Sequence, residues 1–295
     1  MSDAFVKLPV GDSAVSITQL GFGCARLFSG SELRASTRLV ETALASGIQH
    51  FDTAPTYSWG QSEEVLGVVL EGVRGVTVAT KVGLMSPQGA PHPLASVYRQ
   101  AVRPLLAGTP GLKAALLRLA GRTGQRKRPR PPLRHLLPSE INKSLDESLA
   151  RLRRDRVDML LIHEPEDLII GEDVVEVLTR LRSEGVIGAF GLAWGDYPSG
   201  GHVLGQVDQH RFRDDFQIDS AHKGVIMILH GIMRGMDRQK TLRPPERVAE
   251  VCARLPACAV LFSASSPSQV RDVAAAVKDR LAVSRPSRAG CADSQ

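Results

Sequence analysis

The sequence predicts a single α/β domain, a closed (β/α)8 barrel with an N-terminal hairpin, and two observations carry this prediction. Short apolar runs alternate with amphipathic segments of helical length, which is the pattern of βα units on a parallel sheet. Eight strand candidates in 295 residues are typical of a barrel rather than an open sheet. The candidates cover residues 15–21, 47–51, 76–81, 157–163, 189–192, 216–219, 225–229 and 259–263.

Start and stop signals for helices lie between these strands. The segment 33–46 ends before Gly47, and glycine readily adopts the left-handed conformation found after a helix. Ser139 is expected to cap the helix that follows it, and Pro267 to open the last helix. Ahead of the barrel, Gly11 lies between two short apolar segments, which predicts a hairpin.

Three stretches depart from the regular alternation. Residues 85–138 form a connection far longer than an ordinary βα loop, and such connections are usually functional or disordered. Only residues 220–224 separate the sixth and seventh strand candidates, too few for a crossover. Either the sixth helix is missing or one strand is misplaced. The tail 282–295 is small and polar, and we expect it to be flexible.

The composition disfavours several classes of protein. A hydrophobic fraction of 43% is enough to form a hydrophobic core. The sequence contains no run of about 18 apolar residues, which a membrane-spanning helix would need. The net charge of +6 comes from the long connection, which argues against a protein built around nucleic acid. We therefore expect a cytoplasmic monomer without membrane, nucleic-acid or metal partners. The scattered cysteines, with no disulfide or zinc pattern, are Cys24, Cys252, Cys258 and Cys291.

Four chemically active side chains are predicted at the ends of strands. Asp52 ends the second strand and Tyr57 follows it, while Lys81 and His163 end the third and fourth. These ends meet at one mouth of a barrel. The ammonium is expected to lower the phenol's pKa from about 10, and the imidazole to hydrogen-bond a substrate oxygen. The set predicts a general acid aimed at a carbonyl that receives hydride.

The sequence around these residues resembles the aldo-keto reductase family. Its motifs have the family's order and spacing over residues 5–190, apart from the long connection, and again over 260–277. The resemblance implies a barrel that interconverts carbonyls and alcohols with a nicotinamide cofactor. The segments that carry it are residues 50–57, Gly60, 62–67, 79–83, 144–152 and 157–163.

The resemblance also implies a catalytic tetrad and a cofactor site. The tetrad is Asp52, Tyr57, Lys81 and His163, with Tyr57 as proton donor. Gln217 matches the glutamine that holds the nicotinamide carboxamide, and His230 lies near the place of a tyrosine that stacks on the ring. The residues that match the phosphate-binding loop and helix start are Ser263, Ser265, Ser266 and Gln269, with Arg271 as a substitute cation.

The cofactor site departs from the family pattern. The family usually has Ser-Asn after strand five, whereas this chain has Ala193-Trp194. A Lys and an Arg that commonly bind the adenosine 2′-phosphate correspond to Ser263 and Gln269. The cofactor is therefore expected to be NADP(H) or NAD(H).

Three functions remain open, and the first two act on a small carbonyl or sugar substrate. The first is an oxidoreductase acting on an aldehyde or ketone. The second is a sugar dehydrogenase that oxidises a hemiacetal with the same residues. The third is a cofactor-binding pseudo-reductase, which the altered cofactor contacts favour and the intact tetrad opposes. The basic segment 118–134 is either a solvated loop or a lid; it lacks the interleaved aromatics of a nucleic-acid site.

Overall fold

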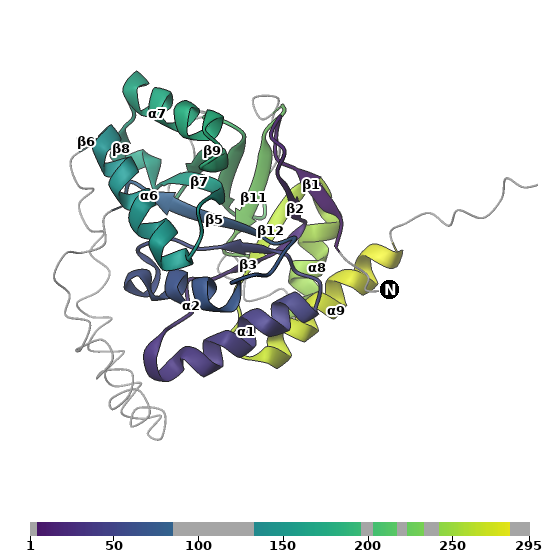
Figure 1. Cartoon of the computed structure of the whole chain (residues 1–295). Helices are drawn as coiled ribbons and strands as arrows, with labels where there is room; N and C mark the ends of the chain where they lie inside the picture. The colour runs from purple at the N-terminus through teal and green to yellow at the C-terminus, as the bar shows by residue number, and fades with distance from the viewer. Residues whose placement is uncertain (1–4, 85–132, 196–202, 217–222, 233–241, 284–295) are drawn as a thin grey trace, which may run out of the picture.

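The chain folds as a closed barrel of eight parallel strands surrounded by helices (Figure 1). The computed structural model describes residues 5–84, 133–195, 203–216, 223–232 and 242–283. The predicted barrel is confirmed. The strands, in their order around the barrel, are β3 (Leu20–Gly23), β4 (His50–Asp52), β5 (Thr77–Val82), β7 (Val157–His163), β9 (Ile187–Ala193), β10 (Val207–Arg211), β11 (Ile226–His230) and β12 (Cys258–Phe262). The helices are α1 (Leu33–Ala45), α2 (Gln61–Val69), α6 (Pro138–Leu152), α7 (Glu172–Ser183), α8 (Pro244–Arg254) and α9 (Pro267–Val283).

The predicted hairpin precedes the barrel. Strands β1 (Lys7–Pro9) and β2 (Ser16–Thr18) pair in antiparallel fashion, and Gly11 between them has φ 53°. Apolar hairpin side chains such as Val10 and Ile17 form one buried cluster with inward-facing barrel residues such as Met159. Since β3 follows β2 after one residue, the hairpin plugs the N-terminal end of the barrel. The C-terminal mouth remains for polar groups.

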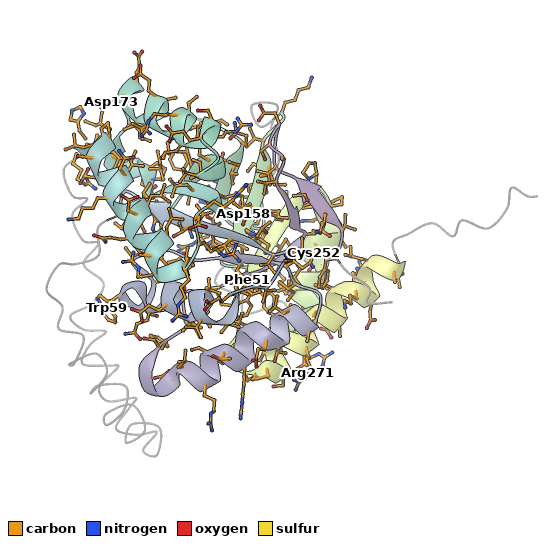
Figure 2. All side chains as sticks on the ribbon, viewed as in Figure 1. Phe51, Trp59, Asp158, Asp173, Cys252 and Arg271 are labelled. Carbon is orange, nitrogen blue, oxygen red and sulfur yellow. The ribbon has the colours of Figure 1, made fainter. Side chains whose placement is uncertain are left out.

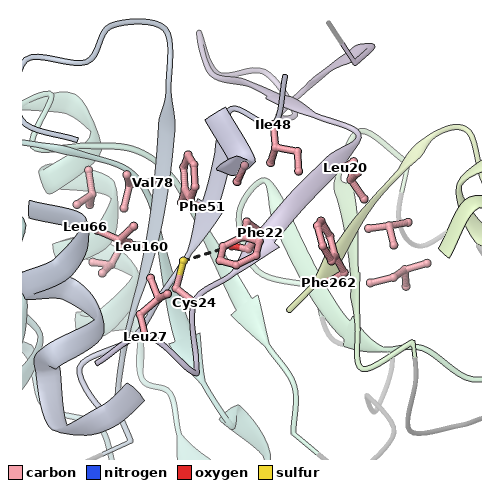
Figure 3. Packing of buried hydrophobic residues seen from close by; sticks show 14 of the residues in the cluster. Leu20, Phe22, Cys24, Leu27, Ile48, Phe51, Leu66, Val78, Leu160 and Phe262 are labelled. Atoms are coloured by element: carbon pink, nitrogen blue, oxygen red, sulfur yellow. Dashed lines mark hydrogen bonds between the residues drawn. The ribbon is translucent and has the colours of Figure 1, made fainter. Parts of the chain in front are cut away.

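A second apolar layer lies between the strands and the helices. On α1 the buried residues recur at helical spacing, so one face of the helix packs inward. Gly47 follows with φ 88°, as predicted for a helix stop. Figure 3 shows the aromatic centre of this layer, where Phe22 meets Phe51 and Phe262 edge-on at centroid distances of 6.4 and 5.6 Å. This packing fixes β3, β4 and β12 against one another.

The predicted start of α6 was wrong by two residues. The residue before this helix is Leu137, and Pro138 occupies its first position. The N–H of Leu137 donates to Oε2 of Glu140 at 2.9 Å, so a carboxylate one turn later does the work expected of Ser139. α9 does begin at Pro267, as predicted.

The predicted sixth strand was also wrong. The barrel strand between β9 and β11 is β10, whereas residue 216 is not in a strand and residues 217–222 lie outside the described part of the chain. Four of the five residues of β10 are polar, so the segment lacks the apolar pattern that predicts a buried strand. Its buried carboxylate is satisfied instead by tertiary partners: Asp208 accepts a hydrogen bond of 2.8 Å from the Trp194 indole and lies 2.9 Å from His210 Nε2.

The irregular connections are described only in part. Of the link between β10 and β11, residues 212–216 and 223–225 contain no helix. Of the predicted insertion, residues 85–132 lie outside the described part, and with them most of the proposed lid. Residues 134–135 form β6 (Arg134–His135), which pairs with β8 (Leu168–Ile169). The tail was expected from residue 282, but α9 continues to Val283. No helix within the described ranges is long and apolar enough to cross a membrane.

Candidate active site

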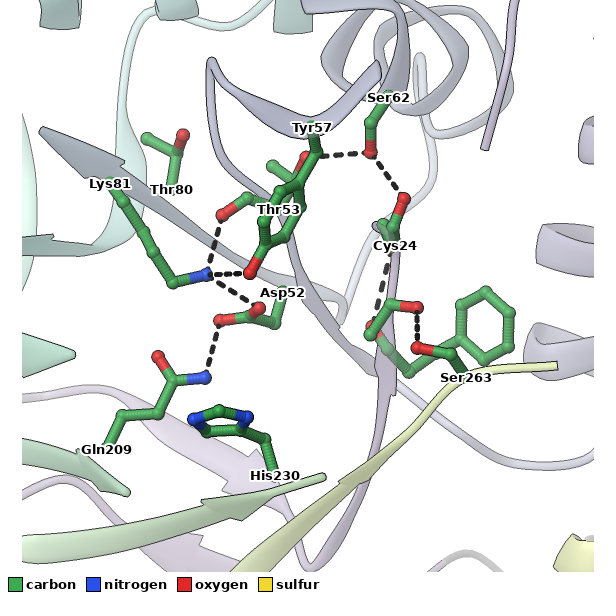
Figure 4. Close-up of polar contacts among 12 residues, drawn as sticks. Cys24, Asp52, Thr53, Tyr57, Ser62, Thr80, Lys81, Gln209, His230 and Ser263 are labelled. Atoms are coloured by element: carbon green, nitrogen blue, oxygen red, sulfur yellow. Dashed lines mark hydrogen bonds and ion pairs between the residues drawn. The ribbon is translucent and has the colours of Figure 1, made fainter. Parts of the chain in front are cut away.

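Lys81 occupies the centre of the site, at the C-terminal end of β5. Its ammonium is buried and contacts Asp52 Oδ1 at 2.7 Å, the Thr53 carbonyl oxygen at 2.9 Å and the Tyr57 hydroxyl at 3.3 Å (Figure 4). Because an ammonium has three protons, these three contacts match its hydrogen-bonding capacity. The structure thus places three of the four predicted catalytic side chains in direct contact.

His163 lies on the other side of the phenol. It ends β7, and its ring meets that of Tyr57 edge-on with a centroid distance of 6.0 Å. Burial lowers the pKa of His163 to about 3, and the charges of Lys81 and His230 act in the same direction. The imidazole is therefore neutral near pH 7 and can donate or accept a hydrogen bond. All four predicted tetrad residues meet at one mouth.

The phenol of Tyr57 is held in its protonated form. Burial raises its pKa, the ammonium of Lys81 opposes that rise, and the Asp52 charge adds to it. Lys81 lowers the pKa of Tyr57 as expected, but the net pKa is raised, because desolvation outweighs the effect of the ammonium. Lys81 is also buried, but Asp52 and Tyr57 outweigh the desolvation and raise its pKa. The site contains a charged ammonium beside a neutral phenol.

The chain turns sharply after Tyr57. Ser58, Trp59 and Gly60 have φ values of 52°, 57° and 84°, so three consecutive residues adopt the left-handed conformation. Two of them are not glycine, and such a conformation costs energy that the surrounding structure must offset. The turn lets α2 begin immediately after the tyrosine, which aims the phenol back toward Lys81.

A partly buried ion pair supports the strand that carries Lys81. The fully buried carboxylate of Glu63 on α2 accepts a hydrogen bond of 2.6 Å from the Thr80 hydroxyl and one of 2.7 Å from Arg151 Nε. At Gly67, one turn along α2, a Cβ would lie 2.2 Å from the Arg151 carbonyl oxygen. Close approach of α2 and α6 and the ion pair together anchor β5 beside Lys81.

Sequence reasoning missed Gln209. This residue of β10 is 2% exposed, pairs in register with Ala193 and donates from Nε2 to Asp52 Oδ2 at 3.3 Å. Its Oε1 is buried and has no hydrogen-bond partner. The glutamine predicted on the sixth strand, Gln217, lies outside the described residues. The one sequence signal for this strand is the period-2 spacing of Val207 and Gln209, which is typical of a β-strand. The polar residues next to them mask that pattern.

His230 ends β11 beside Gln209 at the same mouth (Figure 4). Its Nε2 lies 3.4 Å from the Trp194 carbonyl oxygen. Burial lowers its pKa to about 4, with the charge of Lys81 as the next cause. The predicted place of His230 near the site is consistent with this geometry. The Trp194 indole, in contrast, is bound to Asp208 and leaves no side-chain donor where the family has Ser-Asn.

The predicted phosphate-binding residues divide into two groups. Ser265 donates to Gln269 Oε1 from both its N–H (2.8 Å) and its hydroxyl (3.1 Å), and Ser266 Oγ accepts from the Gln269 N–H at 3.3 Å. These three residues surround the start of α9. Ser263 instead donates to the Gly23 carbonyl at 2.6 Å, on β3. Arg271 is exposed on the outside of α9 (Figure 2). Within the described ranges, no three His, Cys, Asp or Glu residues are placed to hold a metal.

Comparison with known proteins identifies relatives of the chain. Residues 19–198 match the aldo/keto reductase family. The aldo-keto reductase YhdN of Bacillus subtilis is 25% identical over 191 residues, which cover 62% of this chain and 45% of that protein. A D-threo-aldose 1-dehydrogenase of Pseudomonas sp. is 29% identical over 192 residues, which cover 61% and 51%. The chain spans about half the length of these curated relatives.

Solved structures extend the likeness of the fold to the whole chain. The crystal structure of an aldo-keto reductase from Klebsiella pneumoniae, in complex with NADPH, superposes with a TM-score of 0.59 at 16% identity. The match covers 99% of this chain and 100% of that one. At this identity the likeness concerns the fold alone. With the sequence match over residues 19–198, it follows that the chain belongs to the aldo/keto reductase family.

Proposed function

We propose that the protein is an oxidoreductase that interconverts an aldehyde or ketone and an alcohol with NADP(H) or NAD(H). One observation carries the proposal: the Lys81 ammonium bridges Asp52 and the hydroxyl of Tyr57, with His163 beside the phenol. A protonated phenol next to a fixed cation is a general acid whose conjugate base is stabilised where it forms.

Each tetrad residue has one task in this proposal. The carbonyl oxygen of the substrate accepts a hydrogen bond from Tyr57 and from the neutral imidazole of His163. As negative charge develops on that oxygen, Tyr57 gives up its proton, and the phenolate is stabilised by the Lys81 ammonium 3.3 Å away. Asp52 keeps Lys81 charged and directed. When bound, the nicotinamide supplies or accepts the hydride.

The residues at the mouth suit a nicotinamide cofactor. The buried, unpartnered Oε1 of Gln209 is an acceptor for an amide N–H group, and the N-terminus of α9 suits a phosphate. Ser265, Ser266 and Gln269 would contact that phosphate after exchanging their present hydrogen bonds. Arg271 is the nearby cation on the same helix.

A sugar dehydrogenase is the second candidate. It is favoured by the similarity to the D-threo-aldose 1-dehydrogenase, which covers 61% of this chain. The chemistry would run in the opposite direction, with Tyr57 as a base that accepts the hydroxyl proton. The raised pKa of Tyr57 favours donation over acceptance at neutral pH, so carbonyl reduction is our first proposal.

Cofactor binding followed by a substrate panel tests the proposal. NADPH and NADH fluorescence titrations measure affinity, and loss of cofactor absorbance measures the reduction of aldehydes and ketones, with aldoses plus NAD(P)+ as the alternative assay. Tyr57→Phe should lower turnover by about 100-fold or more, because it removes the general acid, while cofactor affinity stays within about twofold. Near-normal turnover in this variant would refute the tetrad's role. Cofactor binding without turnover in the wild-type protein would favour the pseudo-reductase.

A further inference from the structure

The Asp52 carboxylate is held from two sides of the barrel. Its Oδ1 pairs with Lys81 on β5 at 2.7 Å, and its Oδ2 accepts from Gln209 Nε2 on β10 at 3.3 Å (Figure 4). Asp52 and Gln209 are each 2% exposed, so bulk water has little access to replace either contact. Two donors on different strands, β5 and β10, fix the rotation of a carboxylate better than one.

The orientation of the Gln209 amide is set by this contact. A carboxylate oxygen can only accept, so the NH2 group must face Asp52 and Oε1 must point away. That leaves Oε1 buried without a partner, which destabilises the folded chain. Inward-facing neighbours on β9 are small, as at Ala193, and leave space for the side chain. Packing alone does not account for a polar amide here.

We infer that Gln209 is a positioning residue of the tetrad, whose amide holds the Asp52 carboxylate so that Lys81 stays against the Tyr57 oxygen. The inference rests on the proposed function, in which Tyr57 is the acid. Gln209 touches neither the phenol nor the lysine in this arrangement; it acts through Asp52. Without the amide, the Asp52 carboxylate is free to rotate, and the ammonium that it holds at 2.7 Å moves with it, away from Tyr57.

Loss of the amide should therefore raise the pKa of Tyr57. The contribution of Lys81, which lowers that pKa, weakens with distance, and the contribution of Asp52, which raises it, gains because its charge is less neutralised. The other titratable groups that face the cluster are Cys24 just after β3, His50 on β4, His163 on β7 and His230 on β11. All three imidazoles are neutral above pH 5, so none changes charge in the alkaline range where the phenol titrates.

Direct titration of the phenol tests this inference without cofactor or substrate. The chain contains three tyrosines, so Tyr98→Phe and Tyr197→Phe leave Tyr57 as the single tyrosine. With tyrosine labelled at 13Cζ, the NMR shift of that carbon follows ionisation between pH 7 and 11. In this background Gln209→Met, which keeps an unbranched chain but removes the amide, should reduce the ionised fraction at a fixed pH below the midpoint by about tenfold, one pH unit.

A matched control and a double variant separate positioning from general damage. Gln19 is also 2% exposed and donates to the Cys252 carbonyl at 2.9 Å, on α8. Gln19→Met removes a comparable buried hydrogen bond and should leave the Tyr57 titration unchanged. In an Asp52→Asn background, Gln209→Met should have no further effect, because the residue acts through Asp52.

Two results would overturn the inference: an unchanged Tyr57 titration in Gln209→Met, or an equal shift with and without the Asp52 carboxylate. If Gln209→Met does not fold, Gln209→Leu removes the donor with a second apolar side chain. It should raise the Tyr57 pKa by about as much, and an unchanged titration would again refute the inference. Failure of the carbonyl panel with the expected shift would instead refute the proposed function alone.

Discussion

Two effects act in opposite directions on the pKa of the Tyr57 hydroxyl. Withdrawal from water favours the neutral phenol, whereas the ammonium at 3.3 Å favours the phenolate. The neutral form wins in the free protein. That balance suits an acid, because the proton is present before reaction and the cation stabilises the anion that remains.

Carbonyl reduction should therefore be nearly independent of pH from 6 to 9 and fall at higher pH. The rate requires protonated Tyr57, whose pKa is raised above 10, so activity is lost as the pH rises through that value. Alcohol oxidation should rise with pH over the same range. His163 and His230, with pKa values of about 3 and 4, add no step near pH 6.5. The measurement is kcat against pH at saturating substrate and cofactor, in both directions.

The control for this profile is Tyr57→Phe, whose residual rate should lack the alkaline decline. A step between pH 6 and 7 in kcat for reduction would contradict the neutral state of both imidazoles. An alkaline decline that persists in Tyr57→Phe would assign it to another group.

Discrimination between NADPH and NADH should be weak, about tenfold or less. Ser263 and Gln269 stand where the family carries cations, and both already make neutral hydrogen bonds within the protein. A charge-assisted contact to the 2′-phosphate contributes about 1.5–3 kcal/mol, and its loss would largely remove a preference. Competitive binding of the two cofactors measures the ratio. A preference for NADPH beyond a hundredfold that Arg271→Gln abolishes would show that Arg271 supplies the missing charge.

At the residue scale, sequence and structure agree where chemistry and strand ends coincide. Asp52, Lys81 and His163 were predicted to meet because each ends an apolar strand, and parallel strand ends share one rim. Gln209 escaped prediction because its contact with Asp52 joins residues 157 positions apart. The net pKa of Tyr57 also escaped, since the degree of burial depends on the folded chain.

At the element scale, apolar runs predicted most of the strands. One strand was missed because its residues are mostly polar. β7 lies over residues 157–163 as expected, because its residues are hydrophobic on both faces. β10 consists largely of polar residues, and its burial depends on partners such as Trp194 and Asp52 that only the tertiary structure supplies. The segment 216–219 alternates in polarity, but the barrel closes without it. In such cases tertiary contacts, and not the local sequence pattern, decide which segment forms the strand.

Replacement of Gly191 by alanine tests the position of the sixth strand. In the structure a Cβ at residue 191 would lie 1.8 Å from the carbonyl oxygen of Val207 and 2.6 Å from its carbonyl carbon. Backbone of a paired barrel strand has little freedom to withdraw, so Gly191→Ala should destabilise the protein by about 3 kcal/mol, at the upper end of overpacking costs. The free energy of unfolding in urea gives the value.

A second glycine serves as the control. Gly185 has φ 74°, and nothing lies within 4 Å of a Cβ built there. Gly185→Asn should change the free energy of unfolding by less than about 1 kcal/mol, because Asn tolerates the left-handed conformation. If Gly191→Ala were as mild as this control, β10 would not lie against β9 in the register described.

On the scale of the whole molecule, the barrel divides into a dry end and a polar end. The hairpin fills the N-terminal end with apolar side chains, and the polar groups gather at the C-terminal mouth. His50, at the start of β4, is also fully buried and has Nδ1 3.0 Å from the Thr77 hydroxyl and Nε2 without a hydrogen bond. Burial lowers its pKa to about 4. Three buried neutral imidazoles, His50, His163 and His230, therefore lie in the barrel.

These three histidines should make the protein unstable in mild acid. Each has a folded pKa of about 3 or 4, below the unfolded value of about 6.5, so between those values the unfolded chain binds more protons. The free energy of unfolding must then fall as the pH falls from 6.5, with a limiting slope of about 4 kcal/mol per pH unit for three groups. Asp158 and Glu164 have pKa values raised by burial and act in the opposite sense near pH 4–5. The window from pH 6.5 to 5 is the cleanest.

Urea unfolding at several pH values in this window measures the slope, and single variants divide it among the histidines. His50→Gln removes one buried imidazole that is not part of the proposed tetrad and should reduce the slope by about one third. His135 is exposed on β6, so His135→Gln is the matched control and should leave the slope unchanged. A free energy of unfolding that stays constant from pH 7 to 5 would show that the imidazoles gain protons without unfolding. In that case the neutral state assigned to His163 in catalysis would have to be abandoned as well.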